Sequence, residues 1–307
     1  MSALPIALAG IGKIARDQHV PTLAESGDFE LVAAVTGHEA PQGIPAFPDI
    51  DAMMAAMPQV KAIAICTPPR GRLALVEQAL GHGLHVMIEK PPAATLSEAE
   101  AFARMAAEAG RTFFASWHSR AAAGVAPALD WLRGRTIRNV TVNWKEDVRF
   151  WHPGQEWIWE PGIGVFDPGI NALSVITRLL PHGLILEEAD LRFPANRQAP
   201  IAADLHLDSA GVPVRVAFDF DQRGPQTWMI DIETDHGLLT LTDGASRMAV
   251  DGAAVDVGNE GEYPRLYRHF AQLIAAGRSD IDLTPFRLVA DAFLLGRRTV
   301  VEPFDWI

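Results

Sequence analysis

A glycine-rich turn that joins a strand to a helix near the start of the chain constrains the fold more than any other feature. An apolar strand is expected over residues 6–9, the turn GIGKIA occupies 10–15, and a helix is expected over 14–25. In a GxGxxA turn, small residues let the backbone approach a phosphate closely, and the N–H groups at the helix start face it. A position between strand and helix distinguishes the motif from an ordinary glycine turn. The turn predicts a dinucleotide site that includes Gly10, Gly12, Lys13 and Ile14.

The first part of the chain alternates between strands and helices. Further strands are expected at 30–35, 61–66, 85–88 and 112–116, and helices at 49–57 and 73–82. Ser97 and Glu100 have the spacing of a capping box, which would begin a helix that runs to about Ala109. Repeated units of this length imply a parallel sheet with right-handed crossovers. We therefore predict a Rossmann-type NAD(P)-binding domain over residues 1–118.

The pattern changes beyond residue 119. Strand-like runs joined by short turns are typical of an antiparallel sheet, and they occur at 137–144, 184–193, 202–207, 214–220, 227–234 and 238–242. Helices are expected up to about 132 and at 165–180, 263–276 and 285–300. Two domains suit a chain of 307 residues. Residues 119–307 are predicted to form an α/β domain with a mostly antiparallel open sheet, and the last helix could pack back on the first domain.

Composition excludes several classes of function. The net charge of −12 argues against nucleic acid and anionic membranes as partners, and no apolar run approaches the roughly 20 residues that span a bilayer. The single cysteine, Cys66, cannot form an internal disulfide, and the first strand begins too early to leave room for a signal peptide. A cytoplasmic location is expected. The histidines lack HExxH-like spacing, so we predict no metal site.

The residues after the second strand leave the choice of cofactor open. An acidic residue there would bind the adenosine ribose of NAD, and an arginine would favour the phosphate of NADP. The segment 35–38 reads VTGH and offers neither. Thr36 could bind a ribose hydroxyl or a phosphate, whereas His38 could face a phosphate or point into solvent. Use of both NAD and NADP is therefore predicted.

A lysine follows the fourth strand of the first domain. Glu89 and Lys90 lie at the carboxyl end of that strand, the edge of a parallel sheet that faces the ligand crevice. Lys90 could hold a substrate hydroxyl or transfer a proton, which is a common task of a positioned lysine. The alternative is a solvated surface lysine.

A second cluster of functional groups runs from Trp144 to Asn171. Four of the eight tryptophans fall within sixteen residues, interleaved with groups such as Glu146 and His152. Aromatic rings stack on the C–H faces of sugars while polar groups bind hydroxyls, so the cluster could form a carbohydrate pocket. A tryptophan-rich core or subunit interface is the alternative.

Asp167 and Asn171 close this cluster, and their spacing permits two interpretations. At positions i and i+4 they share one face of a helix, where both could reach the same substrate. Asp167 before Pro168 is also a standard helix start, with the aspartate as N-cap.

The motifs together resemble the glucose–fructose oxidoreductase/inositol dehydrogenase/MocA family. The resemblance is carried over essentially the whole chain by the GxGxxA turn, the strand end CTP at 66–68, the motif EKP at 89–91 and the segment DPGIN at 167–171. Within the family, the segments 117–120, 144–147, 151–154 and 165–173 are similar to those of bacterial aldose 1-dehydrogenases that act on D-galactose and L-arabinose.

The resemblance implies NAD(P)-dependent oxidation of an aldopyranose at C1 to the lactone, by a homodimer or larger homo-oligomer. The catalytic set that it implies is Asp167, Lys90 and Asn171. The implied sugar ligands are Glu146, His152, Trp151 and His118. The cofactor contacts that it adds to the glycine-rich turn are Thr36, His38, Cys66, Thr67, Pro68, Glu89 and Lys90. A cis peptide before Pro91 is common in the family and would help to fix Lys90.

Three departures from the family pattern limit what the resemblance implies. Asn171 stands where most members have histidine, and because asparagine is neither acid nor base, proton transfer should fall to Asp167 or Lys90. Arg72 stands where many members have histidine, and Thr36-Gly37 replaces a serine–arginine pair of NADP-preferring enzymes. The alternatives are another polyol or sugar dehydrogenase and a non-catalytic NAD(P)-binding regulator.

Overall fold

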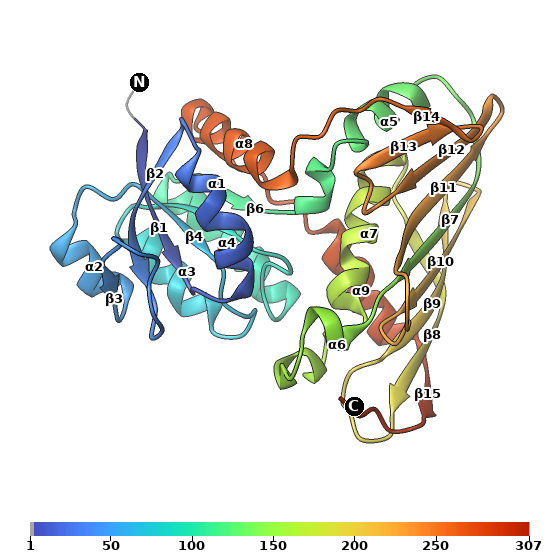
Figure 1. Cartoon of the computed structure of the whole chain (residues 1–307), viewed down its shortest axis with the longest axis horizontal. Coiled ribbons are helices and arrows are strands. Elements are labelled where there is room, and N and C mark those ends of the chain that lie inside the picture. The colour runs from blue at the N-terminus through green and yellow to red at the C-terminus, as the bar shows by residue number, and fades with distance from the viewer. Residues whose placement is uncertain (1–2, 307) are drawn as a thin grey trace. The chain divides into compact units, whose positions relative to one another are not determined.

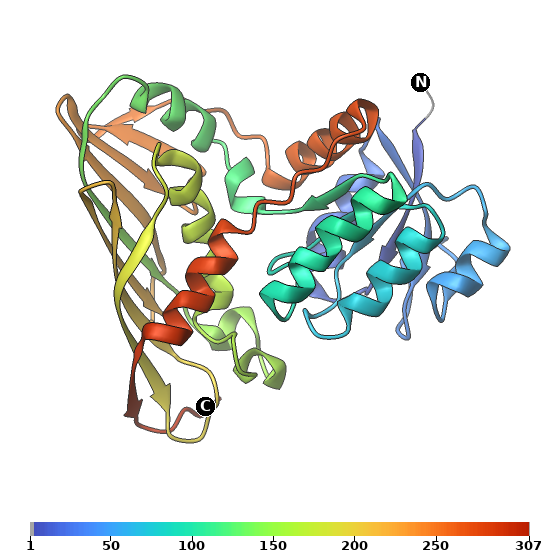
Figure 2. The same cartoon turned by 180° about the vertical axis from the view of Figure 1, so that it is seen from behind.

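The computed structural model describes residues 3–306, which form two compact units (Figures 1 and 2). The first unit contains the described residues through His118 together with Gly261–Leu283. The second contains Ser119–Glu260 and the described residues from Thr284 onward. No helix within 3–306 combines the length and apolar character that crossing a bilayer requires.

The first unit is built on a six-stranded sheet in the order β3-β2-β1-β4-β5-β6, and all neighbouring strands are parallel. The strands are β1 (Leu4–Ala9), β2 (Phe29–Val35), β3 (Ala46–Phe47), β4 (Ala62–Ile65), β5 (His85–Ile88) and β6 (Phe113–Ala115). The strand order reverses direction between β1 and β4. In open α/β sheets, ligands bind outside the carboxyl ends of the strands at such a point.

Helices cover both faces of this sheet. They are η1 (a π-helix, Ala15–His19), α1 (Val20–Ala24), α2 (Ile50–Ala56), α3 (Arg72–Gly81), α4 (Leu96–Ala109) and α8 (Glu262–Ala276). Figure 2 shows α3 and α4 on one face, and Figure 1 shows α1 and α8 on the other. The buried face of α8 carries Phe270, whose ring stacks on Phe29 and on Phe114.

The capping box of α4 lies two residues earlier than predicted. Thr95, not Ser97, is the N-cap, and its hydroxyl accepts the N–H of Glu98. The carboxylate of Glu98 in turn accepts the N–H of Ala94. Both pairs have the T/S-x-x-E spacing, so the sequence pattern alone did not separate them.

The second unit is built on a nine-stranded sheet in the order β14-β13-β12-β11-β7-β10-β9-β8-β15. Its strands are β7 (Ile137–Lys145), β8 (Ile185–Pro194), β9 (Ala202–Ser209), β10 (Val212–Asp219), β11 (Thr227–Thr234), β12 (Gly237–Thr242), β13 (Arg247–Val250), β14 (Ala253–Val255) and β15 (Arg297–Val301). Neighbours are antiparallel except in the pairs β10–β7 and β15–β8, which are parallel. The predicted fold class is confirmed: a parallel Rossmann sheet is followed by a mostly antiparallel one.

Helices of the second unit cover one face of its sheet (Figure 1). They are η2 (His118–Ala121), α5 (Val125–Leu132), α6 (Val148–Trp151), η3 (Glu156–Trp159), α7 (Phe166–Leu179) and α9 (Thr284–Leu295). Phe166 of α7 packs edge-to-face on Phe218 of β10 and contacts Phe293 of α9. The alternating burial along β7 leaves the opposite face of the sheet more exposed.

The C-terminal region differs from the prediction in two respects. Helix α8 groups with the first unit instead of with 119–307, while the last helix, α9, groups with the second unit. The helix predicted over 285–300 ends at Leu295, and β15 follows. Gly296 interrupts the helix, and the β-branched residues of 299–301 favour a strand.

Candidate active site

The glycine-rich turn has the geometry that its sequence predicted. Gly10 has a φ of +87°, a backbone angle that residues other than glycine rarely adopt. A Cβ at Gly10 would lie 2.8 Å from Cγ2 of Thr67 and 2.9 Å from its backbone nitrogen. The turn and the loop after β4 therefore approach each other closely, and glycine is required there on both grounds.

The same turn fits a bound dinucleotide. No atom lies within 4 Å of the position that a Cβ of Gly12 would take, so a phosphate has room to approach the backbone. The residues from Gly12 to Ile14 are exposed, whereas Ala15 is fully buried and lets the helix pack on the sheet. The buried hydroxyl of Thr67 has no hydrogen-bond partner among residues 3–306. An unsatisfied buried hydroxyl is expected where a ligand completes a site.

The other predicted cofactor residues follow the strands at the same edge of the sheet. Thr36 and His38 come after β2, and the hydroxyl of Thr36 accepts the N–H of His38 at 2.9 Å. Residues 66–68 follow β4, and Glu89 and Lys90 follow β5. Arg16 also contacts this region, because its guanidinium donates to the carbonyl of Glu39 in the loop after β2 at 2.7 Å. The residues at the end of the second strand gave no sign of this contact, because Arg16 approaches the loop from the helix.

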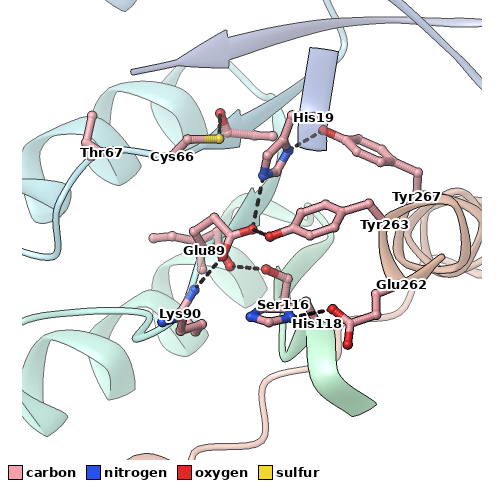
Figure 3. A network of polar contacts seen from close by, with 12 residues as sticks. His19, Cys66, Thr67, Glu89, Lys90, Ser116, His118, Glu262, Tyr263 and Tyr267 are labelled. Carbon is pink, nitrogen blue, oxygen red and sulfur yellow. Dashed lines mark hydrogen bonds and ion pairs between the residues drawn. The ribbon is translucent and has the colours of Figure 1, made fainter. Parts of the chain in front are cut away.

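Glu89 lies at the centre of a buried polar cluster (Figure 3). Its side chain is almost fully buried, with 4% exposed. Oε1 lies 3.0 Å from Nε2 of His19 and accepts a hydrogen bond from the hydroxyl of Tyr263 at 2.8 Å. Oε2 accepts the backbone N–H of Lys90 at 3.1 Å. The hydroxyl of Tyr267 lies 2.7 Å from Nδ1 of His19.

The charges of this cluster stabilise each other. Burial disfavours a charged Glu89, but the hydrogen bond and charge of His19 outweigh it and lower the pKa of Glu89 to about 2. Burial likewise opposes a charged His19, yet Cys66, Tyr267 and Glu89 around it raise its pKa well above the usual value. The two side chains therefore form a buried ion pair at neutral pH.

Arg72 holds the same loop through its carbonyl groups. The side chain is 2% exposed, and its guanidinium donates to the carbonyls of Glu89 and Pro91. The guanidinium also donates to the carbonyl of Thr67, with Nε at 3.0 Å. It thereby connects the loops after β4 and β5. The Lys90–Pro91 peptide is cis, as the family resemblance implied.

His118, a predicted sugar ligand, lies just beyond β6 and contacts α8. Its Nδ1 is 2.6 Å from Oε2 of Glu262, and its ring stacks on Tyr263. Burial opposes a charge on His118, but the charge and hydrogen bond of Glu262 outweigh it and raise the pKa of His118.

These shifts predict how the free energy of unfolding depends on pH. Histidines whose pKa is raised by folding stabilise the protein fully below 6.5, the usual histidine pKa, and lose this effect as pH rises through the raised values. Glu89 stabilises it above 4.5 and loses the effect as pH falls toward 2. Urea titrations should therefore show stability falling from pH 6.5 upward, with a shallower fall in His19→Gln. An equally steep fall in the variant would contradict the assignment to His19.

In the second unit, Asp167 lies inside the first turn of α7. The N-cap of this helix is Val165, which makes no side-chain capping bond, so the N-cap interpretation of Asp167 is wrong. The carboxylate of Asp167 is largely buried, and its Oδ2 lies 3.2 Å from Nε2 of His152. Asn171 is half-buried one turn further along α7. The helix packs tightly, because a Cβ on Gly169 would lie 2.7 Å from the ring of Phe218.

Neighbouring groups determine where His152 carries its protons. The indole N–H of Trp157 can only donate, and it lies 2.9 Å from Oε1 of Gln155, which must therefore be an acceptor. Nδ1 of His152 lies 3.3 Å from that oxygen and is the donor in this contact. Nε2 then faces the carboxylate of Asp167, whose Oδ2 lies 3.2 Å away.

The remaining predicted sugar ligands lie around Trp228, which sequence analysis missed. Oε2 of Glu146 accepts the indole N–H of Trp228 at 2.9 Å. The ring of Trp151 lies 5.8 Å from that of Trp228, and its N–H donates to Gln226 at 2.7 Å. A pairing of β7 with β11 brings Trp228 beside these residues, and no local pattern indicates that pairing.

The four tryptophans between residues 144 and 159 differ in burial, which bears on whether they belong to the core or to a ligand site. Trp144 and Trp159 are buried and belong to the core of the second unit. Trp151 and Trp157 are partly exposed beside His152 and Glu146. A core role therefore accounts for two of the four residues, and the other two are available to a ligand.

Comparisons with known proteins agree with this architecture. The family model described as an oxidoreductase family with an NAD-binding Rossmann fold matches residues 4–116. Galactose 1-dehydrogenase from Pseudomonas fluorescens is 47% identical over 306 residues, which cover 99% of each chain. The crystal structure of D-galactose-1-dehydrogenase from Rhizobium etli is 48% identical, covers 99% of each chain and has a TM-score of 0.96.

A more distant structure shows the fold alone. A 3-ketoreductase from Actinomadura kijaniata, solved in complex with NADP, has a TM-score of 0.83 at 17% identity and covers 98% of this chain and 100% of its own. The full-length similarity at 47% identity, together with the Rossmann match, is decisive for the family. The chain belongs to the GFO/IDH/MocA family of NAD-binding oxidoreductases.

Proposed function

We propose that this protein is an aldose 1-dehydrogenase that oxidises D-galactose, L-arabinose or both at C1 of the pyranose to the aldonolactone. The first unit would bind NAD(P) and the second unit the sugar. The observation that carries the proposal is the Asp167–His152 pair, in a chain that is similar over its whole length to galactose 1-dehydrogenases. A carboxylate in contact with an imidazole is suited to removing a proton from a sugar hydroxyl.

Each catalytic residue has a separate role in the proposed reaction. Asp167 accepts the proton of the anomeric hydroxyl as C1 loses its hydrogen with the bonding electrons, and the C1–O1 bond becomes the lactone carbonyl. The nicotinamide, when bound, supplies the hydride acceptor. Lys90 and Asn171 hold the C1 and C2 hydroxyls, and the mechanism requires Lys90 and Asp167 to reach the same substrate.

The other predicted ligands surround the sugar in this proposal. His152 orients Asp167 through their contact at 3.2 Å, and it borders the sugar together with Glu146 and Trp151. His118 completes the set of sugar ligands. Partly exposed aromatic rings beside these polar groups support carbohydrate binding, because a ring covers the C–H face of a pyranose while its neighbours bind the hydroxyls.

Use of both cofactors is part of the proposal. The loop after β2 carries no acidic residue that would repel the 2′-phosphate of NADP. Arg16 contacts that loop and offers it a positive charge. Neither feature strongly favours one cofactor over the other, so NAD⁺ and NADP⁺ should both support turnover.

The preference between the two sugars depends on one substituent. D-Galactose and L-arabinose share their configuration from C1 to C4, and L-arabinose lacks the exocyclic CH₂OH at C5. A site that binds the shared hydroxyls accepts both. Packing around C5 then sets a preference of about 1–3 kcal/mol.

A panel of aldoses combined with NAD⁺ and NADP⁺ tests the proposal. Absorbance of the reduced nicotinamide should rise with D-galactose and L-arabinose, and much less with D-glucose, the C4 epimer of D-galactose. Turnover of inositol or another polyol alone would favour a different substrate of the family. Bound cofactor without turnover of any substrate would favour a regulator. Sedimentation of the same sample would test the homo-oligomer that we expect.

A further inference from the structure

The buried cluster around Glu89 has no part in the proton and hydride transfers, yet it contacts the backbone of Lys90. Three donors converge on one carboxylate: the imidazole of His19 from η1, the hydroxyl of Tyr263 from α8, and the N–H of Lys90 itself (Figure 3). Donors from two separate helices thereby fix a side chain whose other oxygen holds the next residue of the chain.

We propose that His19 and Glu89 form a buried ion pair whose task is to position Lys90, which makes His19 a positioning residue for the reaction. The importance assigned to Lys90 rests on the proposed function. The contact between the pair and the Lys90 backbone does not.

The physical reason lies in the burial of the carboxylate. A buried charge that loses its partner is strongly destabilised, so it takes up a proton or moves toward water. Glu89 is 4% exposed and has His19 as its ionised partner. Without His19, the carboxylate would no longer offer Lys90 the same charge-assisted hydrogen bond, which is stronger than a neutral one.

A buried arginine binds the same stretch of backbone from its other side. Arg72 donates to the carbonyls of Glu89 and Pro91, the residues on either side of Lys90. The N–H of Lys90 and its two flanking carbonyls are therefore bound by buried side chains. Such a backbone keeps the side chain of Lys90, which is half-buried, in a narrow range of positions, as a catalytic contact requires.

The groups around His19 leave Glu89 as its ionised partner at neutral pH. Burial raises the pKa of Tyr267 to about 12 and raises that of Tyr263 well above its usual value, so both phenols keep their protons at neutral pH. Cys66 also lies beside His19. A protonated His19 donates from Nδ1 to the Tyr267 oxygen and from Nε2 to Glu89, which satisfies both ring nitrogens.

The chain contains four lysines, and this small number allows the Lys90 amide to be observed directly. Labelling with ¹⁵N-lysine gives four backbone amide signals, from Lys13, Lys61, Lys90 and Lys145. The signal that disappears in a Lys90→Arg variant identifies Lys90. Its position reports on the hydrogen bond to Glu89 without any substrate.

The test compares His19→Gln with a matched control, His82→Gln. His82 also pairs with a carboxylate, that of Asp51 at 2.6 Å, but this pair is exposed. We expect His19→Gln to shift the Lys90 amide signal while the other three lysine signals stay in place, and to lower kcat on the order of 10- to 100-fold. The control should change neither the Lys90 signal nor kcat.

Each outcome decides the proposal. A Lys90 signal in folded His19→Gln that coincides with the wild-type signal would overturn it. If His19→Gln loses the dispersed spectrum of a folded protein, Tyr263→Phe, which removes one hydrogen bond to Glu89, must shift the Lys90 signal or the proposal fails. A shifted signal with unchanged kcat would support the positioning pair and contradict the proposed role of Lys90.

Discussion

Replacing Asp167 by asparagine should lower kcat by roughly 100-fold or more, the scale of a lost general base. Asparagine keeps the size of the side chain and can still contact His152, but it cannot accept a proton from the anomeric hydroxyl. The helix should be unaffected, because its N-cap is Val165 and no side chain caps it. Steady-state rates with D-galactose at saturating NAD⁺ measure the effect.

The control for this prediction is Asp204→Asn. Asp204 also pairs with a base, Arg192 at 2.6 Å, but it is partly exposed on β9. Its kcat should remain at the wild-type level, and both variants should unfold at temperatures close to the wild type. Near-normal turnover in Asp167→Asn would remove Asp167 from the mechanism and leave Lys90 as the proton acceptor.

The parts of the fold that depend on local pattern were predictable. The glycine-rich turn, the parallel strands and the antiparallel sheet follow from turn residues and hydrophobic periodicity, and each appears close to its expected position. Gly10 is an example. Only glycine combines a positive φ with such a close approach to Thr67, so a glycine at this position by itself indicates the tight turn.

The parts that depend on distant partners were not predictable. Sequence spacing allowed Asp167 to be either an N-cap or a substrate contact, and only the start of α7 at Phe166 excluded the N-cap. The contact of Asp167 with His152 was likewise not visible in the sequence. The role of α8 depends on aromatic packing against Phe29 and Phe114 in the first unit. No periodicity in α8 indicates which sheet it covers.

The residues that hold the backbone of Lys90 were not predictable for the same physical reason. His19, Arg72 and Tyr263 belong to three helices, and each appears in the sequence as an isolated polar residue. Only the folded chain shows that they meet at the loop after β5. The family resemblance identified Lys90 itself, because its motif is contiguous.

Replacing Lys90 by methionine should also lower kcat by roughly 100-fold or more, because the variant loses the ammonium that, in the proposed function, holds the reacting hydroxyl and polarises it. Methionine keeps a long unbranched side chain, and the backbone contacts of residue 90 with Glu89 remain available. Lys90→Arg should recover part of the loss, since it restores the charge but not the compact geometry of an ammonium. Affinity for NAD⁺, measured by fluorescence titration, should change little.

The matched control is Lys61→Met. Lys61 is exposed and precedes β4 of the same sheet, so it lies at the amino edge, opposite to the edge that carries Lys90. Loss of its charge should leave kcat and the KM for D-galactose unchanged. If Lys90→Met turns over as fast as Lys61→Met, the ammonium has no part in the chemical step. Proton transfer and hydroxyl binding would then fall to Asp167 and Asn171 alone, both on one face of α7.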